Sequence, residues 1–224
     1  MTVVGTGVHP IDLYDEALRG ARDGSGVRWR WRSHDGSVAE LPVLTWSADL
    51  DDADRLVVER CTGPALDVGC GPGRLAAALT GRVPVALGID VSREAVRLTR
   101  QRGGSAERRD VFGSVPGAGT WQHVLLADGN VGIGGDAVAL LRRAGELLAP
   151  GGEVVCEVGP PGSPTGPALV RLEADGRASD WFGWDRVACD DVERVAGQAG
   201  LVVVDAFSAP SSGGRRWFAC LVAS

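Results

Sequence analysis

The sequence predicts an α/β protein built on a doubly wound, mostly parallel sheet. From Pro64 onward, short β-rich runs alternate with longer helical runs, and the connections between them are short. The β-rich runs are nearly continuous in apolar residues, which is typical of strands covered by helices on both faces. A glycine-rich turn follows the first of these runs, at the point where an open parallel sheet receives its ligand.

The alternation after Pro64 predicts seven strands and four helices. The strands are expected over residues 64–69, 83–90, 105–112, 121–129, 153–159, 201–207 and 215–223. The helices are expected over residues 73–81, 92–103, 136–152 and 190–200. Ser92 and Asp136 stand at two expected helix N-caps. The connection APSSGG between the last two strands is rich in turn residues, so we expect an antiparallel C-terminal edge strand.

The first 60 residues do not join this alternation. We expect residues 1–60 to form a cap or lid segment of the same domain as residues 61–224, because no long flexible linker separates the two. Within the cap, the patterns predict a helix, a strand with a turn at HDG, and a second helix, over 14–22, 27–37 and 48–61. Residues 159–170 are rich in glycine and proline and are expected to form a loop or mobile lid.

Composition limits the partners and the compartment. The net charge of −6 argues against nucleic acid, because phosphate binding requires a positive field. No run approaches the roughly 20 apolar residues of a membrane helix, and the N-terminus lacks a signal-peptide pattern. The five cysteines include no CxxC, and no acidic or histidine cluster has ligand spacing. We therefore expect a cytoplasmic protein without a membrane span, a disulfide framework or a metal site.

The residues around the glycine turn restrict its ligand. A GxG pattern alone is weak evidence, but GCGPG (69–73) is followed by Arg74 where a dinucleotide fingerprint has its third glycine, so pyrophosphate is poorly supported. Asp67 lies inside the preceding strand, where a buried carboxylate needs a ligand amino group or a link to the turn as its partner. Asp90 ends the next strand, where a carboxylate can accept both hydroxyls of a ribose.

Four motifs in this order give the chain a family resemblance. LDVGCGPGRL (66–75) resembles the first motif of class I S-adenosyl-L-methionine (SAM)-dependent methyltransferases, and GIDVS (88–92) resembles their acidic ribose motif. RRDVF (108–112) is similar to their adenine-binding segment, and LLAPGGEVVCEV (147–158) to the segment that closes the set. The resemblance implies a Rossmann-like seven-stranded sheet, SAM as the cofactor and S-adenosyl-L-homocysteine as the product.

The resemblance assigns the methionine end of the cofactor to the first strand and its turn. Asp67 and the backbone of Gly69 would hold that end, while Gly71 and Gly73 would allow the ligand to approach the backbone closely. Cys70 lies within the same cofactor-binding turn as an incidental occupant.

The adenosine end would lie along the following strands. Asp90 would take the ribose hydroxyls, and Val91 would pack on the adenine. Asp110 would meet the adenine N6 with Val111 beside it, although Asp110 could instead be a solvated carboxylate after two arginines. Ala127 would lie near the sulfonium.

The candidate catalytic residues are Asp128, Asn130 and His34. Asp128 could accept a proton or orient an amine, and Asn130 could hydrogen-bond the acceptor, but DGN also favours a simple turn. No proline or aromatic residue follows Asn130, which is unlike amino-group methylases of nucleic acid bases. His34 is an exposed turn residue or, if the cap folds over the cofactor, a base. Tyr14 would cover the cofactor or make an ordinary helix contact.

The stretch WFGWD (181–185) supplies aromatic side chains after the fifth strand. They could stack a planar or apolar acceptor, or they could belong to the core or to a dimer contact.

Two classes of function fit these observations. The first is a SAM-dependent methyltransferase that methylates an O or N atom of a small molecule, such as a secondary metabolite, as a monomer or homodimer. A base is needed only where the acceptor must lose a proton. The second is a SAM-fold binding or regulatory protein without methyl transfer. A protein or RNA methyltransferase is a weaker alternative, since no basic appendage or added domain is present to hold a macromolecule.

Overall fold

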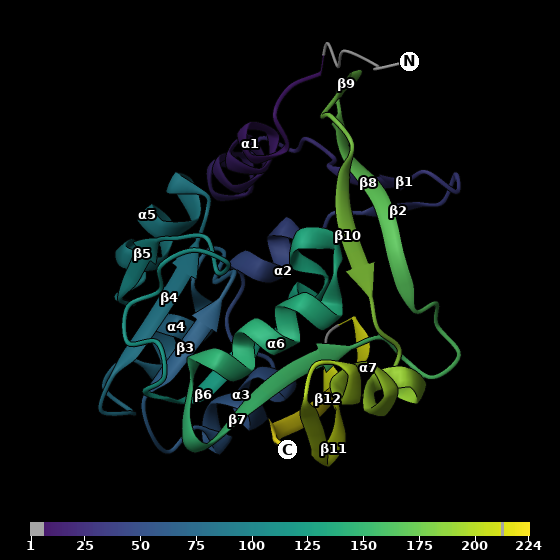
Figure 1. Ribbon diagram of the computed structural model, residues 1–224. Helices are drawn as coiled ribbons and strands as arrows, with labels where there is room; N and C mark the ends of the chain where they lie inside the picture. The colour runs from purple at the N-terminus through teal and green to yellow at the C-terminus, as the bar shows by residue number, and fades with distance from the viewer. Residues whose placement is uncertain (1–6, 212) are drawn as a thin grey trace.

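The computed structural model describes residues 7–211 and 213–224, and it contains two β-sheets (Figure 1). The larger sheet has seven strands in the order β11-β12-β7-β6-β3-β4-β5. These strands are β3 (Ala65–Val68), β4 (Ala86–Asp90), β5 (Ala106–Arg108), β6 (Trp121–Leu126), β7 (Leu148–Val158), β11 (Leu201–Ser211) and β12 (Gly214–Ala223). Strands β3 to β7 are parallel to one another, whereas β12 is antiparallel to both β7 and β11. The predicted seven-stranded α/β fold with an antiparallel C-terminal strand is confirmed, with β12 inserted next to the edge strand β11.

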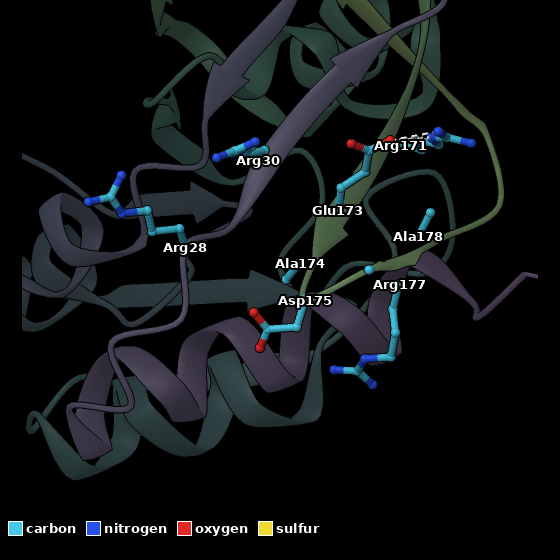
Figure 2. A pocket seen from close by; sticks show the side chains of 9 residues that line it. Arg28, Arg30, Arg171, Glu173, Ala174, Asp175, Arg177 and Ala178 are labelled. Carbon is cyan, nitrogen blue, oxygen red and sulfur yellow. Dashed lines mark hydrogen bonds and ion pairs between the residues drawn. The ribbon is translucent and has the colours of Figure 1, made fainter.

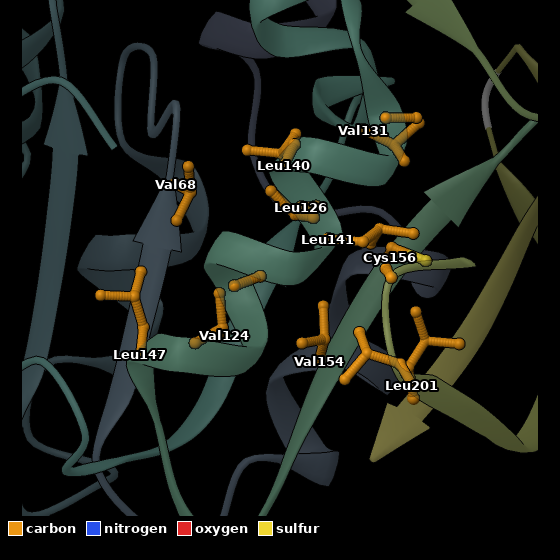
Figure 3. Close-up of a cluster of buried hydrophobic side chains, with 14 of the residues drawn as sticks. Val68, Val124, Leu126, Val131, Leu140, Leu141, Leu147, Val154, Cys156 and Leu201 are labelled. Atoms are coloured by element: carbon orange, nitrogen blue, oxygen red, sulfur yellow. The ribbon is translucent and has the colours of Figure 1, made fainter. Parts of the chain in front are cut away.

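Helices cover both faces of the seven-stranded sheet. They are α3 (Asp52–Arg60), α4 (Arg74–Leu79), α5 (Arg93–Gln101), α6 (Ala137–Leu147) and α7 (Val192–Gln198). Because successive strand residues point to opposite faces, each strand contributes to two cores. Leu126 packs in the core under α6 and α7 (Figure 3), whereas Leu125 packs in the core under α3 and α4. The near-continuous apolar runs in the sequence follow from this burial on both sides.

The helix ends show where local signals succeed and where they fail. Ser92 and Asp136 accept the N-cap hydrogen bonds of α5 and α6, as predicted. The predicted extension of the second of these helices to residue 152 is wrong, because β7 already begins at Leu148 beside Trp121 of β6. Pro150 and the two glycines after it are poor helix formers, and this segment pairs as a strand instead. The strand predicted over 105–112 is also shorter, since β5 ends at Arg108.

The second sheet joins segments that are far apart in the chain. Its strands are β1 (Arg30–Ser33), β2 (Val38–Glu40), β8 (Gly166–Ala174), β9 (Arg177–Ala178) and β10 (Phe182–Arg186). Their order is β10-β8-β1-β2, with β9 beside β8, and every pair is antiparallel. The predicted loop over 159–170 is therefore wrong from Gly166 onward. The predicted strand and turn over 27–37 correspond to β1 and the turn after it.

Two further helices precede the seven-stranded sheet in the chain. α1 (Pro10–Asp23) packs against α5, and α2 (Val43–Ser47) packs against α1 (Figure 1). The first six residues of the predicted 1–60 segment lie outside the described residues. No helix within the described ranges is long and apolar enough to cross a membrane.

The core under α6 gives a direct test of this packing. Leu140 of α6 is fully buried (Figure 3), so Leu140→Ala should lower the free energy of unfolding by about 2–5 kcal/mol through lost burial and the cavity left behind. Leu44→Ala in α2 is the matched control, because 69% of that side chain is exposed. Urea denaturation measures both variants, and equal losses would contradict the described core.

Candidate active site

A cavity of about 760 Å³ opens at the carboxyl ends of β3, β4 and β6, against the second sheet. Ten residues singled out from the sequence line it: Tyr14, Gly69, Cys70, Gly71, Asp90, Val91, Asp110, Val111, Asp128 and Asn130. Four others do not reach its wall. Asp67, Gly73 and Ala127 belong to the strand ends and turns next to it, and His34 lies in the turn between β1 and β2.

The glycine turn has the conformation that its sequence requires. Gly73 has φ +85°, and a Cβ there would lie 2.6 Å from the Thr99 backbone, so this glycine permits contact between the turn and α5. Gly71 has φ +53°, and a Cβ there would lie 3.4 Å from the Tyr14 hydroxyl. Cys70 is buried with its thiol 3.5 Å from the Thr99 hydroxyl. Its side chain therefore packs inside the turn.

Asp90 fixes the glycine turn to the end of β4. Its Oδ2 accepts a hydrogen bond from Gly71 N (3.0 Å), and its Oδ1 accepts one from Ser92 N (2.8 Å). Burial raises the pKa of Asp90 to about 6, while the backbone donors oppose the shift. Each carboxylate oxygen can accept a further bond, so Asp90 can also bind donors of a ligand in the cavity.

Asp67 is the second buried acid at the turn. It is 3% exposed and has no wall position in the cavity. Burial raises its pKa to about 7, with Arg74 lowering it and the nearby carboxylates of Asp128 and Asp90 raising it. Asp67 is therefore a carboxyl whose charge depends on pH in the neutral range.

An ion-pair network lies behind the glycine turn. Arg74, the first residue of α4, donates from Nε to Asp54 Oδ2 (2.7 Å) and from Nη1 to Asp128 Oδ2 (2.6 Å). Arg216 of β12 donates from Nη1 to Asp54 Oδ1 and from Nη2 to Glu157 Oε2, both at 2.7 Å. The sequence analysis missed this network. Its members come from five separate segments, and the only local signal was the arginine directly after the glycines.

The network determines what the predicted catalytic residues can do. Asp128 has φ +55°, its two oxygens accept from Arg74, and its N–H donates to Glu157 Oε2 (2.6 Å). Asn130 donates from Nδ2 to the carbonyl oxygens of Val68 and Gly69, at 2.9 Å each. Both side chains thus brace the strand ends and the turn. The roles of Asp128 as a proton acceptor and of Asn130 as an acceptor contact stay predictions.

His34 stays apart from the cavity. Its side chain is exposed and lies edge-on to Trp181, with 5.5 Å between the ring centroids. In this hairpin, Trp31 of β1 lines the cavity, whereas the turn that carries His34 does not. The exposed-turn alternative fits this placement, and the prediction of His34 as a base does not.

Aromatic side chains form the wall opposite the glycine turn. Trp31 lies 5.2 Å from Trp184 and 5.9 Å from Phe182 between ring centroids, and Trp181 lines the cavity beside them. Trp46 adds a further ring from α2. Trp181, Phe182 and Trp184 of the WFGWD stretch therefore line the cavity, which is the position that an acceptor pocket requires. Trp31 and Trp46 were not foreseen, because their sequence context shows only an alternating strand and an apolar segment.

Helix α1 covers the cavity next to Asp90. Ser92 Oγ donates to Asp15 of α1, and Arg19 Nε lies 3.7 Å from Glu94 Oε2 on α5. These contacts hold Tyr14 over the glycine turn, where burial raises the pKa of its hydroxyl well above the usual value. The phenol is therefore neutral at physiological pH and available as a hydrogen-bond partner.

A smaller hollow of about 380 Å³ lies on the second sheet and shares no lining residue with the cavity. Figure 2 shows its side chains, including Arg28, Arg30 and Arg171, together with Glu173 and Asp175. The Arg171 guanidinium pairs with Glu173 at 2.6 Å. Among the residues that the structure describes, no group of three or more His, Cys, Asp or Glu side chains could hold a metal ion.

The chain resembles SAM-dependent methyltransferases in part of its sequence and in its fold. The family model described as a methyltransferase domain matches residues 65–152, which include the glycine turn, Asp90, Asp110 and Asp128. This match confirms the resemblance seen in the sequence motifs. A search of curated proteins with the whole chain finds no match.

Solved structures share the fold at low sequence identity. A SAM-dependent methyltransferase from Bacteroides fragilis, in complex with S-adenosyl-L-homocysteine, has a TM-score of 0.77 at 22% identity and covers 98% of both chains. The CcbJ methyltransferase from Streptomyces caelestis has a TM-score of 0.58 at 18% identity, over 80% of this chain and 92% of its own. CalS10, an amino pentose methyltransferase from Micromonospora echinaspora, has a TM-score of 0.55 at 19% identity, over 79% and 91%. The first likeness extends over the second sheet as well as the larger one.

The buried carboxyl of Asp67 predicts a pH-dependent stability. Its folded-state pKa of about 7 lies above the usual 3.8, so the stability it contributes is fully present below about pH 4 and is lost as the pH rises through 7. Asp67→Asn keeps the shape and removes the titration. The variant should therefore gain free energy of unfolding relative to the parent between about pH 4 and 7.

Urea denaturation across this pH range measures the difference for Asp67→Asn and for Glu193→Gln, an exposed acid on α7 that serves as the control. A difference between Asp67→Asn and the parent that stays constant from pH 4 to 8 would contradict a raised pKa for Asp67.

Proposed function

We propose that the chain transfers a methyl group from SAM to an O or N atom of a small molecule. The observation that carries the proposal is a single cavity with two different ends. One end has the glycine turn and the acids Asp90 and Asp110, and the other has a wall of aromatic rings. Such a cavity holds a polar nucleoside cofactor and an apolar acceptor next to each other.

The cofactor end offers the partners that SAM requires. Asp90 can accept the ribose hydroxyls with the lone pairs that Gly71 and Ser92 leave free. Asp110 and Val111 lie at the wall beside Val91, where the adenine would pack. The methionine end would lie against the backbone of Gly69 under Tyr14.

The chain's own contribution to the reaction is alignment and exclusion of water. When bound, SAM supplies an activated methyl group on a good leaving group, so an in-line approach of the acceptor suffices. Arg74, Asp128 and Asn130 hold the strand ends that set the cofactor position. The aromatic wall orients the acceptor, and α1 covers the cofactor. A neutral amine acceptor needs no base, whereas a hydroxyl acceptor must lose its proton as it reacts.

The small-molecule class of acceptor has support beyond the cavity. Structural neighbours include an amino pentose methyltransferase and a glycopeptide N-methyltransferase that is complexed with SAM. The net charge of −6 is poorly suited to an RNA substrate, because phosphate binding requires a positive field. A SAM-binding protein without methyl transfer remains the second candidate, because the cofactor end alone would serve it equally well.

A transfer assay separates these two candidates. The purified chain is incubated with methyl-labelled SAM and a panel of amines, phenols and alcohols, and both labelled product and S-adenosyl-L-homocysteine are measured. Methyl transfer to at least one acceptor, above a control without protein, is the expected result. Tight SAM binding with no transfer to any member of a broad panel would favour the binding protein.

Substitution of Asp90 is the most direct test of whether the glycine-turn end of the cavity binds SAM. Asp90→Ala should weaken SAM binding by about 1–3 kcal/mol, the scale of lost charged hydrogen bonds. Isothermal titration calorimetry measures the affinity, and thermal unfolding shows whether the turn survives. Glu193→Ala on α7 is the control for the loss of one negative charge. An unchanged SAM affinity in Asp90→Ala would refute the ribose assignment.

A further inference from the structure

The cavity wall carries more acids than free bases. Its acidic lining residues are Asp90, Asp110, Asp128 and Asp180. Its two arginines already have carboxylate partners, since Arg74 pairs with Asp54 and Asp128, and Arg109 pairs with Glu107 at 3.0 Å. No guanidinium of the described lining residues is therefore left to receive an anionic acceptor.

The network behind the wall adds to this excess. Four carboxylates, those of Asp51, Asp54, Asp128 and Glu157, surround only two guanidinium groups. Burial and the neighbouring Asp128 raise the pKa of Glu157, even though Arg216 lowers it. Since charges are screened weakly in a partly buried site, this end of the cavity favours positive ligands.

The acceptor end has an acid of its own next to the aromatic rings. Asp180 lies at the wall directly before Trp181 and Phe182, between β9 and β10. Trp31 and Trp184 face the cavity from the same sheet. Aromatic faces attract ammonium groups through their quadrupoles, and tryptophan does so most strongly. The Arg171 guanidinium already lies over the Trp181 ring, 4.8 Å from its centroid, so the rings of Trp31, Trp46 and Trp184 carry the argument for an organic cation.

We infer that the methyl acceptor is an organic amine that carries a positive charge when it enters the cavity. This inference rests on the proposed function and names its substrate class. The acid excess would also offset the repulsion between an ammonium group and the sulfonium of SAM. A carboxylate acceptor would meet four acids and two paired guanidinium groups, with His9 as the remaining basic side chain of the described lining. A neutral alcohol would gain nothing from the charge.

The transfer balances with water as the proton acceptor. The bound ammonium first releases a proton to water, which frees the nitrogen lone pair. That pair forms the N–C bond to the methyl carbon while the C–S bond breaks and its electrons remain on sulfur. The products are a methylated ammonium and S-adenosyl-L-homocysteine.

A pair of isosteres tests the inference without methyl transfer. Choline and 3,3-dimethylbutan-1-ol have the same shape, but only choline is charged. Each is titrated into the protein with and without S-adenosyl-L-homocysteine, with tryptophan fluorescence as the readout and calorimetry as the check. Four of the seven tryptophans line the cavity, so binding there should alter the emission. Choline should bind at least about tenfold more tightly than the neutral alcohol.

Two variants assign the preference to the acceptor end. Asp180→Asn should reduce the choline preference about two- to fivefold, and Trp184→Leu should reduce it by a similar factor. Asp175→Asn removes the same charge from the second sheet at the other hollow (Figure 2) and should leave the preference unchanged. Unchanged affinity for S-adenosyl-L-homocysteine in all three variants shows that the fold is intact.

The outcomes separate the two proposals. Equal affinity for choline and the alcohol, or no binding of either, would overturn the amine inference even if SAM binds normally. A choline preference that survives Asp180→Asn and Trp184→Leu would overturn it as well, since the cation would then bind elsewhere. If the unmutated protein does not bind SAM, the proposed function itself is overturned.

Discussion

Arg74 stands where the glycine turn becomes α4, and carboxylates from two other segments meet its guanidinium. Asp54 comes from α3, and Asp128 follows β6, while Arg216 links the same acids to Glu157 at the end of β7. Breaking a buried pair leaves a charge without compensation, at a cost of about 3–5 kcal/mol. The network therefore fixes the glycine turn relative to three strand ends, and the shape of the cofactor end of the cavity depends on it.

The two sheets divide the cavity between them. The parallel sheet supplies the polar end, because its strands terminate together in Asp90 and in the loops that carry Asp110 and Asp128. The second sheet supplies the aromatic end, because alternate side chains of its strands point to the same face. In β1, Trp31 faces the cavity and the flanking arginines point to the opposite side, where Arg30 lines the separate hollow. One short strand thus contributes to the aromatic wall on one face and to a charged surface on the other.

The sequence was informative wherever the structure depends on neighbouring residues. Helix caps such as Ser92, the glycine turn and Asp90 were all predictable, because their geometry is local. The second sheet was not, since β1 and β8 pair across more than a hundred residues and neither shows its partner. Asp128 was singled out from the sequence, but its ion pair with Arg74 was not, because Arg74 reaches it only in the folded chain.

A crystal structure of the protein with S-adenosyl-L-homocysteine tests the central claim most directly, namely that the cavity holds cofactor and acceptor at its two ends. The account predicts the ribose hydroxyls on Asp90, the adenine between Val91 and Val111, and the sulfur facing the cavity toward Trp184. A ligand bound elsewhere would contradict the claim. So would a sulfur that points away from the aromatic wall, because no acceptor held there could then reach the methyl group.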